Sequence, residues 1–277
     1  MPIRDDQRDG PERVVTGARA ELNERFESDQ LDLDVWVPYY LAHWSSRVES
    51  AATWAIRDRA LHLSIPPEQP LWCADLHAEP LRVSCVQSGS YSGPVGSTAA
   101  PQPFRDGLVV REEQPTLWGY TPRYGRIEAR MRARVDGASM FAFWLSGIED
   151  QPERSGEICV AEVFGATIRD GQADVGMGIH RFRDPGLSEA FRTLRLELDT
   201  TVDHDYAVTW SERDAAFSVD GQQVHRVEQS PGYPMQLMIG VFDFPARRPP
   251  GGPTFVPELT VRRVRGRPIG ASPSPRP

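Results

Sequence analysis

The alternation of side chains over residues 125–135 is the feature that most constrains the fold. Apolar residues stand at the odd positions from Ile127 to Val135, and four arginines and one glutamate stand at the even positions. Successive side chains of a β-strand point to opposite faces of the sheet, so this pattern predicts a strand with one buried face and one solvent-facing face. The chain is therefore expected to build a sheet that packs against a second layer.

Other short apolar or alternating runs, separated by turn-forming residues, repeat this signal along the chain. Regularly spaced short strands predict an all-β sandwich or barrel, and 277 residues are enough for one such domain. Asp220 and Gly221 form the predicted turn of a tight hairpin. Strands are expected at 61–65, 81–87, 108–112, 125–135, 140–145, 175–180, 206–210, 216–219, 223–227, 234–244 and 257–264.

The two ends of the chain differ in composition from its centre. Residues 1–30 are polar and charged and are expected to form an arm, with one short helix over 18–27. Residues 31–266 are assigned to the β-domain, with a Pro/Gly-rich loop at 246–253. The Pro/Ser-rich tail 267–277 is predicted to be disordered.

Residues 155–165 contain the most unusual run, because they set Glu157 and Glu162 into an apolar, β-prone segment. Residues five apart on a regular strand point to opposite faces, so these two side chains would not meet. One extra residue in a β-bulge near Val160 and Ala161 restores the parity, and bulges occur beside active sites. The bulge would place Glu157, Cys159 and Glu162 on one face, with Ile158 and Val163 toward the core.

Two interpretations of this carboxylate pair remain open from the residues alone. A retaining glycosidase needs a nucleophile and an acid/base with carboxyl groups roughly 5–5.5 Å apart, which Glu157 and Glu162 would supply. The alternative is two solvent-facing glutamates on a surface strand. The face of residues 175–180 that carries Gly176, Gly178 and His180 is expected to leave room for a ligand.

Charge and cysteine usage narrow the classes of partner. The net charge is −8 and all 31 basic residues are arginine, a balance that disfavours binding to a nucleic-acid backbone. No run approaches the roughly 18 apolar residues of a membrane helix, so no membrane is expected as a partner. Cys73, Cys85 and Cys159 give an odd count without metal-type spacing, so reduced thiols and no metal site are expected. The charged first residues predict a cytoplasmic protein, or an extracellular one if a leader is missing.

Four motifs in order resemble family 16 of the glycoside hydrolases, whose laminarinase-like members share a concanavalin-type jelly roll of two antiparallel sheets with a concave substrate groove. The resemblance covers about residues 108–264. Residues 124–130 are similar to the family's YGRFEAR strand, and 143–145 to its FWL. Residues 157–162 resemble the bulged E-x-D-x-x-E signature, and 206–210 with 217–221 resemble its YAIEW and FYVDG hairpin.

The resemblance implies roles for individual residues. Glu157 would be the nucleophile, Glu162 the acid/base and Trp144 the ring under the scissile sugar. Cys159 stands where the family pattern has its middle aspartate, so a neutral thiol replaces a negative neighbour and the glutamates are expected to titrate lower. His180 is expected to be a hydrogen-bonder to sugar or a structural residue, and Cys159 is not expected to be a nucleophile. Aromatic candidates for the walls of sugar subsites are Trp36, Tyr39, Tyr40, Trp44, Trp118 and Tyr120.

The expected function is that of an endo-acting, retaining hydrolase or transglycosylase on a β-linked polysaccharide such as a β-glucan or β-galactan. The protein is expected to be a monomer without cofactors, although the fold has room for a structural calcium. One alternative is a carbohydrate-binding jelly roll whose catalytic site has decayed at Cys159. Another is an interaction protein that docks a partner through the aromatic segment 36–44.

Overall fold

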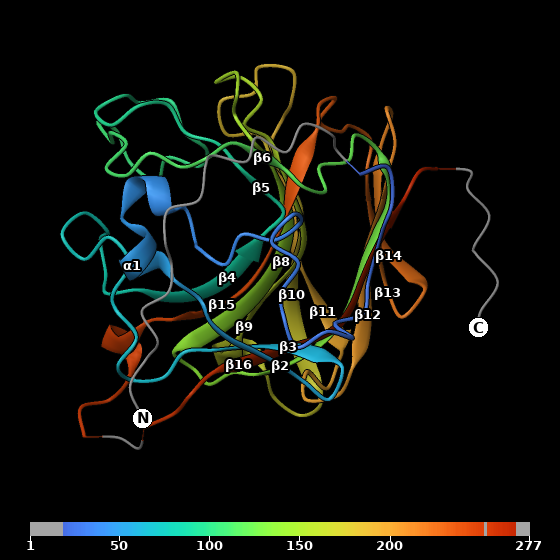
Figure 1. Ribbon diagram of the computed structural model, residues 1–277. Helices are drawn as coiled ribbons and strands as arrows, with labels where there is room; N and C mark the ends of the chain where they lie inside the picture. Colours follow the sequence, from blue (N-terminus) through green and yellow to red (C-terminus); the bar gives the residue numbers. More distant parts are fainter. Residues whose placement is uncertain (1–18, 252–253, 270–277) are drawn as a thin grey trace.

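The computed structural model describes residues 19–251 and 254–269, and within them two large antiparallel sheets face each other (Figure 1). Sheet I has eight strands in the order β14-β13-β12-β7-β16-β3-β2, with β1 also paired to β16. Sheet II has six strands in the order β11-β10-β9-β8-β15-β4. The expected all-β jelly-roll sandwich of two antiparallel sheets is therefore confirmed.

The strands have the following bounds. Sheet I contains β1 (Leu22–Glu24), β2 (Thr53–Arg57), β3 (Ala60–Ser64), β7 (Gly125–Arg134), β12 (His204–Trp210), β13 (Ala215–Val219), β14 (Gln222–Val227) and β16 (Glu258–Arg267). Sheet II contains β4 (Arg82–Gln87), β8 (Ser139–Gly147), β9 (Glu157–Phe164), β10 (Gln172–His180), β11 (Ala190–Glu197) and β15 (Met235–Asp243). A small sheet pairs β5 (Gly89–Ser90) with β6 (Leu117–Trp118). The helical elements are η1 (Ala42–Trp44), α1 (Arg47–Ser50), η2 (Gly165–Thr167) and η3 (Pro245–Arg247).

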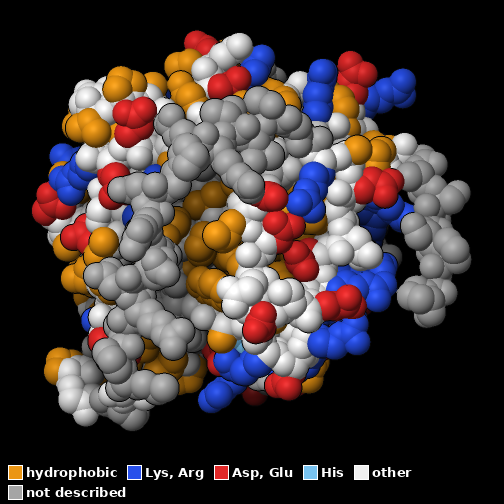
Figure 2. Space-filling model, in the orientation of Figure 1, with side chains coloured by type: hydrophobic (Ala, Val, Ile, Leu, Met, Phe, Trp, Pro, Cys, Tyr) orange, Lys and Arg blue, Asp and Glu red, His pale blue; other side chains and the backbone are white. Residues whose placement is uncertain are grey.

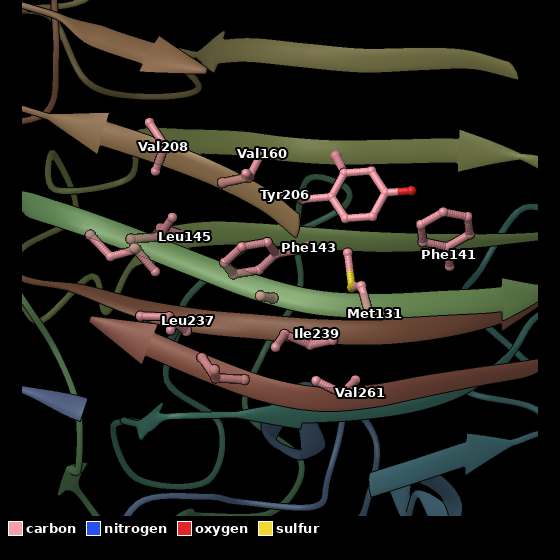
Figure 3. Close-up of a cluster of buried hydrophobic side chains, with 14 of the residues drawn as sticks. Met131, Phe141, Phe143, Leu145, Val160, Tyr206, Val208, Leu237, Ile239 and Val261 are labelled. Atoms are coloured by element: carbon pink, nitrogen blue, oxygen red, sulfur yellow. The ribbon is translucent and has the colours of Figure 1, made fainter. Parts of the chain in front are cut away.

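The main core lies between the two sheets and follows from the alternation along each strand. On β7 the odd positions Ile127 to Ala133 are buried and the even positions are partly or fully exposed, as predicted. From sheet II, Phe141, Phe143 and Leu145 of β8 point into the same layer (Figure 3). Burial of one such aliphatic or aromatic side chain contributes about 1.5–3 kcal/mol, so this layer stabilises the sandwich.

A second apolar layer covers the opposite face of part of sheet II. Met140, Ala142 and Trp144 alternate with the core residues of β8, so they point away from sheet I. Segments between residues 41 and 110 lie over them and bury them. This outer cluster contains Leu41, Trp44, Trp72, Cys73, Leu81, Val83, Cys85, Ala100, Leu108, Val110, Met140, Ala142, Trp144, Met238, Phe242 and Phe244.

The hairpin expected at Asp220 and Gly221 is confirmed. It joins β13 to β14, and both turn residues have positive φ, 50° and 80°. Positive φ at both central residues is the geometry that matches the twist of antiparallel strands, and Asp-Gly adopts it readily.

Two predicted elements are wrong, and others were missed. Residues 108–112 form no strand; Val110 instead exchanges backbone hydrogen bonds with the loop at Gly96 and Ser97. The described part of 18–27 forms no helix but contains β1, because Leu22 is buried by pairing beside β16. Strands β2 and β11 were missed because their exposed positions are crowded with arginine, threonine and glutamate.

Parts of the predicted arm and tail, residues 1–18 and 270–277, lie outside the described residues, as do 252–253 of the loop.

Arginine and acidic side chains are interspersed on the face shown in Figure 2. Among the described helices, none is long and apolar enough to span a bilayer.

Candidate active site

The predicted bulge is present on β9 and gives this strand two differently aligned halves. Phe143 of β8 lies opposite Ala161, whereas the next residue, Trp144, lies opposite Cys159, so Val160 is the extra residue. The pairing with β10 shifts at the same place. Ile158 and Val163 both lie in the main core, as predicted, and Glu157, Cys159 and Glu162 fall on the outer face of sheet II.

The neighbours of the two glutamates follow from the register. Glu157 lies opposite Ser146 of β8 and His180 of β10. Glu162 lies opposite Ala142 and Gly176. Cys159 occupies the position between the two carboxylates along β9, so the three side chains form one column on the outer face.

The environment disfavours the charged form of both glutamates. Burial, and next the charge of Glu162, raise the pKa of Glu157 from 4.5 to about 8. Burial also raises the pKa of Glu162, and the nearby His180 opposes that rise. Two carboxyl groups that interact in this way titrate as a pair, with one proton retained where isolated glutamates would have lost both. The pKa of about 8 means that Glu157 holds a proton at neutral pH, and its carboxyl must lose that proton before it can act as a nucleophile.

One amide is aimed at Glu157 from outside the sheet. Gln102 Nε2 donates a hydrogen bond to Glu157 Oε2 at 2.9 Å, and this donor lowers the pKa that burial raises. The backbone N–H of Gln102 donates to Oε1 of Glu149 at 2.7 Å. Glu149 is only 4% exposed and forms an ion pair with Arg183. A chain of polar contacts from Arg183 through Glu149 and Gln102 therefore holds the proposed nucleophile.

Sequence reasoning missed Gln102, Glu149 and Arg183. Gln102 stands between Pro101 and Pro103 with φ of 53°, and it reaches Glu157 across 55 residues of chain. No local pattern links a glutamine in a proline-rich loop to a strand so distant in sequence. Tertiary structure alone brings the two together.

Cys159 is a buried neutral thiol. Its side chain is 2% exposed, and burial together with the two neighbouring carboxylates raises the thiol pKa well above its ordinary value. The Sγ–H donates to the carbonyl oxygen of Gly176 at 3.6 Å. A thiol nucleophile needs a lowered pKa, so this environment is the opposite of the one that would activate Cys159.

His180 lies on the outer face beside Glu157 but makes its contacts in the other direction. Its Nδ1 is 2.6 Å from Glu189 Oε1, and its ring stacks on Phe191 at a centroid distance of 4.4 Å.

The expectation that the glycines of β10 leave room for a ligand is wrong at Gly176. A Cβ there would lie 2.4 Å from the ring of Phe191, so an aromatic side chain of β11 fills that space.

The aromatic candidates divide into buried and accessible rings. Trp144 is 5% exposed and packs against Phe242 at a centroid distance of 6.0 Å, so only a small part of its ring is open beside the glutamates. Trp36 and Tyr120 are fully packed in the main core and cannot form subsite walls.

Trp118 on β6, Tyr39 and Tyr40 are partly exposed. Tyr40 packs on Trp72 of the outer cluster, at a ring centroid distance of 5.0 Å. Trp36 and Trp44 are 0% exposed within this chain, so among the aromatic residues of the expected docking segment 36–44 only Tyr39 and Tyr40 are partly exposed.

The described residues contain no group of three or more His, Cys, Asp or Glu side chains that could hold a metal ion. The three cysteines are buried and unpaired as disulfides. The structural calcium stays a prediction, and no metal ligand is assigned.

The family model that matches the chain covers the segment that contains this site. Residues 120–252 match the family model described as glycosyl hydrolases family 16. The matched segment is just under half of the chain. The match includes both glutamates, and the family resemblance expected from the four motifs is confirmed.

Solved structures share the fold of this chain at low sequence identity. A GlcNAcα1-4Gal releasing endo-β-galactosidase from Clostridium perfringens is 20% identical with a TM-score of 0.76, over 94% of this chain and 64% of that chain. The chain thus spans just under two thirds of that enzyme's structure. The catalytic domain of an endo-1,3-β-glucanase (laminarinase) from Thermotoga petrophila RKU-1 is 16% identical with a TM-score of 0.58, over 88% and 95% of the two chains.

A prokaryotic β-1,3-1,4-glucanase (lichenase) from a mouse hindgut metagenome is 16% identical with a TM-score of 0.59, over 91% and 100% of the two chains. No curated protein sequence matches the chain. The family match, together with these neighbours, supports a glycoside hydrolase or transglycosylase with a carbohydrate substrate.

Proposed function

We propose that this chain cleaves a β-linked polysaccharide, such as a β-glucan or β-galactan, with retention of configuration. The observation that carries the proposal is the bulge at Val160, which brings Glu157 and Glu162 onto one face of sheet II. Both carboxyl groups have raised pKa values, and no arginine pairs with either among the described residues. Such carboxyl groups are expensive to bury and are characteristic of functional sites.

In the first step a carboxylate oxygen of Glu157 forms a bond to the anomeric carbon while the glycosidic carbon–oxygen bond breaks. Glu162 gives its proton to the departing oxygen, so the leaving sugar is released as an alcohol. The Gln102 amide, which donates to Oε2 of Glu157, orients the carboxylate and favours its ionised form.

In the second step Glu162 takes a proton from water, and the water oxygen bonds to the anomeric carbon. The bond to Glu157 breaks and its electron pair returns to the carboxylate, which restores both side chains. A sugar hydroxyl in place of water gives transglycosylation by the same exchange of bonds. Two displacements at one carbon leave its configuration unchanged.

Wild type, Glu157→Gln and Cys159→Asp are to be compared on a panel of β-glucans and β-galactans. We expect wild type to release saccharides whose first-formed anomer, followed by NMR, matches the substrate linkage, and Glu157→Gln to release none. Cys159→Asp introduces the carboxylate that the family pattern implies and therefore reports whether the thiol limits the rate.

Inactivity of wild type and Cys159→Asp on every polymer would sink the hydrolase proposal. Titration calorimetry then identifies the alternative, because a carbohydrate-binding protein holds the oligosaccharide without shortening it.

A further inference from the structure

The outer face of sheet II is divided into a covered half and an open half. On β4, β15 and β8 the outward side chains are all buried: Cys85 and Met238 are 0% exposed, and Trp144 is 5% exposed. On β11 the outward residues Thr193 and Arg195 are exposed. The boundary runs along β9, the strand that carries both glutamates.

The cover over the first half is a packed structure. Its apolar side chains form the outer cluster, in which Trp72 packs edge-on against Tyr40 at 5.0 Å. The carbonyl oxygen of Pro101 accepts from Trp44 Nε1 at 2.8 Å and lies 3.0 Å from His43 Nε2. Exposing one large buried side chain costs about 1.5–3 kcal/mol, so a saccharide chain could not lie across these strands without displacing several such side chains.

The cover ends directly beside the proposed nucleophile. Gln102 follows the anchored Pro101 and reaches Glu157, so the edge of the cover is fixed to the reacting carboxyl. Oε1 of Gln102 is buried and has no hydrogen-bond partner among the described residues, although buried amide oxygens are normally paired.

A pocket of about 460 Å³ opens at this edge. It is lined by residues of the cover and of the loops after β8 and β10, including Trp44, Gln102, Phe104, Glu149, Phe182 and Arg183. This volume is at the small end of the range for small-molecule sites, roughly 300–1,000 Å³. The pocket reaches the pair of glutamates through Gln102, whose amide contacts Glu157, and it has space for a short saccharide unit.

We propose that the site binds the end of a saccharide chain and releases a short terminal unit, instead of cleaving long chains internally. The chain lies over β9, β10 and β11, and its terminal unit occupies the pocket beside Gln102. This inference rests on the proposed hydrolase function and replaces the endo-acting mode expected from the family resemblance. The bond cleaved and the roles of Glu157 and Glu162 are unchanged.

The first test measures binding without turnover. Glu157→Gln is titrated calorimetrically with a short laminari-oligosaccharide and with laminarin, and in parallel with a short galacto-oligosaccharide and β-1,4-galactan. We expect one protein bound per chain at every chain length, because each chain has one end of the required kind. A stoichiometry that rises with chain length overturns the end-binding proposal and leaves the hydrolase proposal standing. Absence of binding together with absence of wild-type activity overturns both.

The second test follows the products of wild type. A chain-end enzyme releases one short product from the start and lowers the viscosity of the polymer slowly relative to the reducing ends formed. Rapid loss of viscosity with a broad ladder of products contradicts the inference.

Replacement of residues 103–107 by two glycines shortens the exposed edge of the cover and should shift the products toward internal cleavage. The matched control, Val202→Ala, alters an exposed residue away from the cover and should leave the product pattern unchanged. If the shortened variant is less stable than wild type, its product pattern, which does not depend on the amount of folded enzyme, remains the readout.

Discussion

Glu128 on the outer face of sheet I and the two glutamates of β9 on the outer face of sheet II differ in their partners. On sheet I, Glu128 accepts from Arg126 at 3.1 Å and from Arg263 at 2.9 Å. On sheet II, Glu157 and Glu162 have no arginine partner among the described residues, and each lies in an environment that raises its pKa.

The difference distinguishes a structural carboxylate from a reactive one. A partly exposed ion pair such as Glu128–Arg263 contributes about 0–1 kcal/mol and fixes the charge of its members. A buried carboxyl without a cation keeps a proton that it can transfer near neutral pH. Arg126 of β7 and Arg263 of β16 pair with Glu128, whereas no described arginine pairs with either glutamate of β9, and this separates the two kinds of carboxyl.

The largest effect on activity is expected when the carboxylate of Glu157 on sheet II is replaced by an amide. Glu157→Gln removes the proposed nucleophile and should lower kcat/KM by at least about 10³-fold. Glu128→Gln is the matched control on β7, and its kcat/KM should stay within about twofold of wild type. If kcat/KM on the same polysaccharide fell equally in both variants, the absence of an arginine partner would not distinguish a catalytic glutamate from a structural one.

The next effect is on the pH dependence of stability. The folded state raises the pKa of Glu157 from 4.5 to about 8, so between these values the folded chain holds a proton that the unfolded chain has released. The stabilisation from this proton is complete below about pH 4.5 and is lost as the pH rises through about 8. Denaturant unfolding of wild type and Glu157→Gln should therefore diverge by a few kcal/mol across this window, with wild type falling. Parallel curves would contradict the raised pKa of Glu157.

A smaller effect is expected from the loop amide that touches the pair. Gln102→Ala removes the donor that favours ionised Glu157, so the pKa of Glu157 should rise above about 8. The acidic limb of the kcat/KM profile should then move to higher pH, and kcat/KM at neutral pH should fall about tenfold for each pH unit by which that limb moves. Gln172→Ala, whose side chain bonds to Arg195 on the sheet edge, is the control. An unchanged profile with reduced kcat would assign Gln102 a structural role only.

The smallest effect is expected on the free energy of unfolding when an ion pair on sheet I is removed. Glu128→Gln should destabilise the fold by about 0–1 kcal/mol at low salt, and by less at high salt because the ion pairs are partly exposed. Chemical denaturation at two salt concentrations measures this change. If the free energy of unfolding fell by several kcal/mol, the ion pairs of Glu128 with Arg126 and Arg263 would be a main source of the stability of the fold.

The sequence was sufficient for the elements whose patterns are local. The alternation over 125–135, the hairpin at Asp220 and Gly221 and the bulge at Val160 each depend on neighbouring residues and are all present. The strand at 108–112 failed because an apolar run buries itself equally well as a loop beneath other segments. The subsite roles of Trp36 and Tyr120 failed because composition does not tell a wall from a core.

The sequence by itself determined the sandwich and the placement of Glu157 and Glu162 on one face, because side-chain parity along a strand is fixed by backbone geometry. Only the tertiary structure decided what surrounds that pair. Burial, the Gln102 amide and the cover over half of sheet II come from segments far apart in the chain, and the pKa of a carboxyl depends on its surroundings in space.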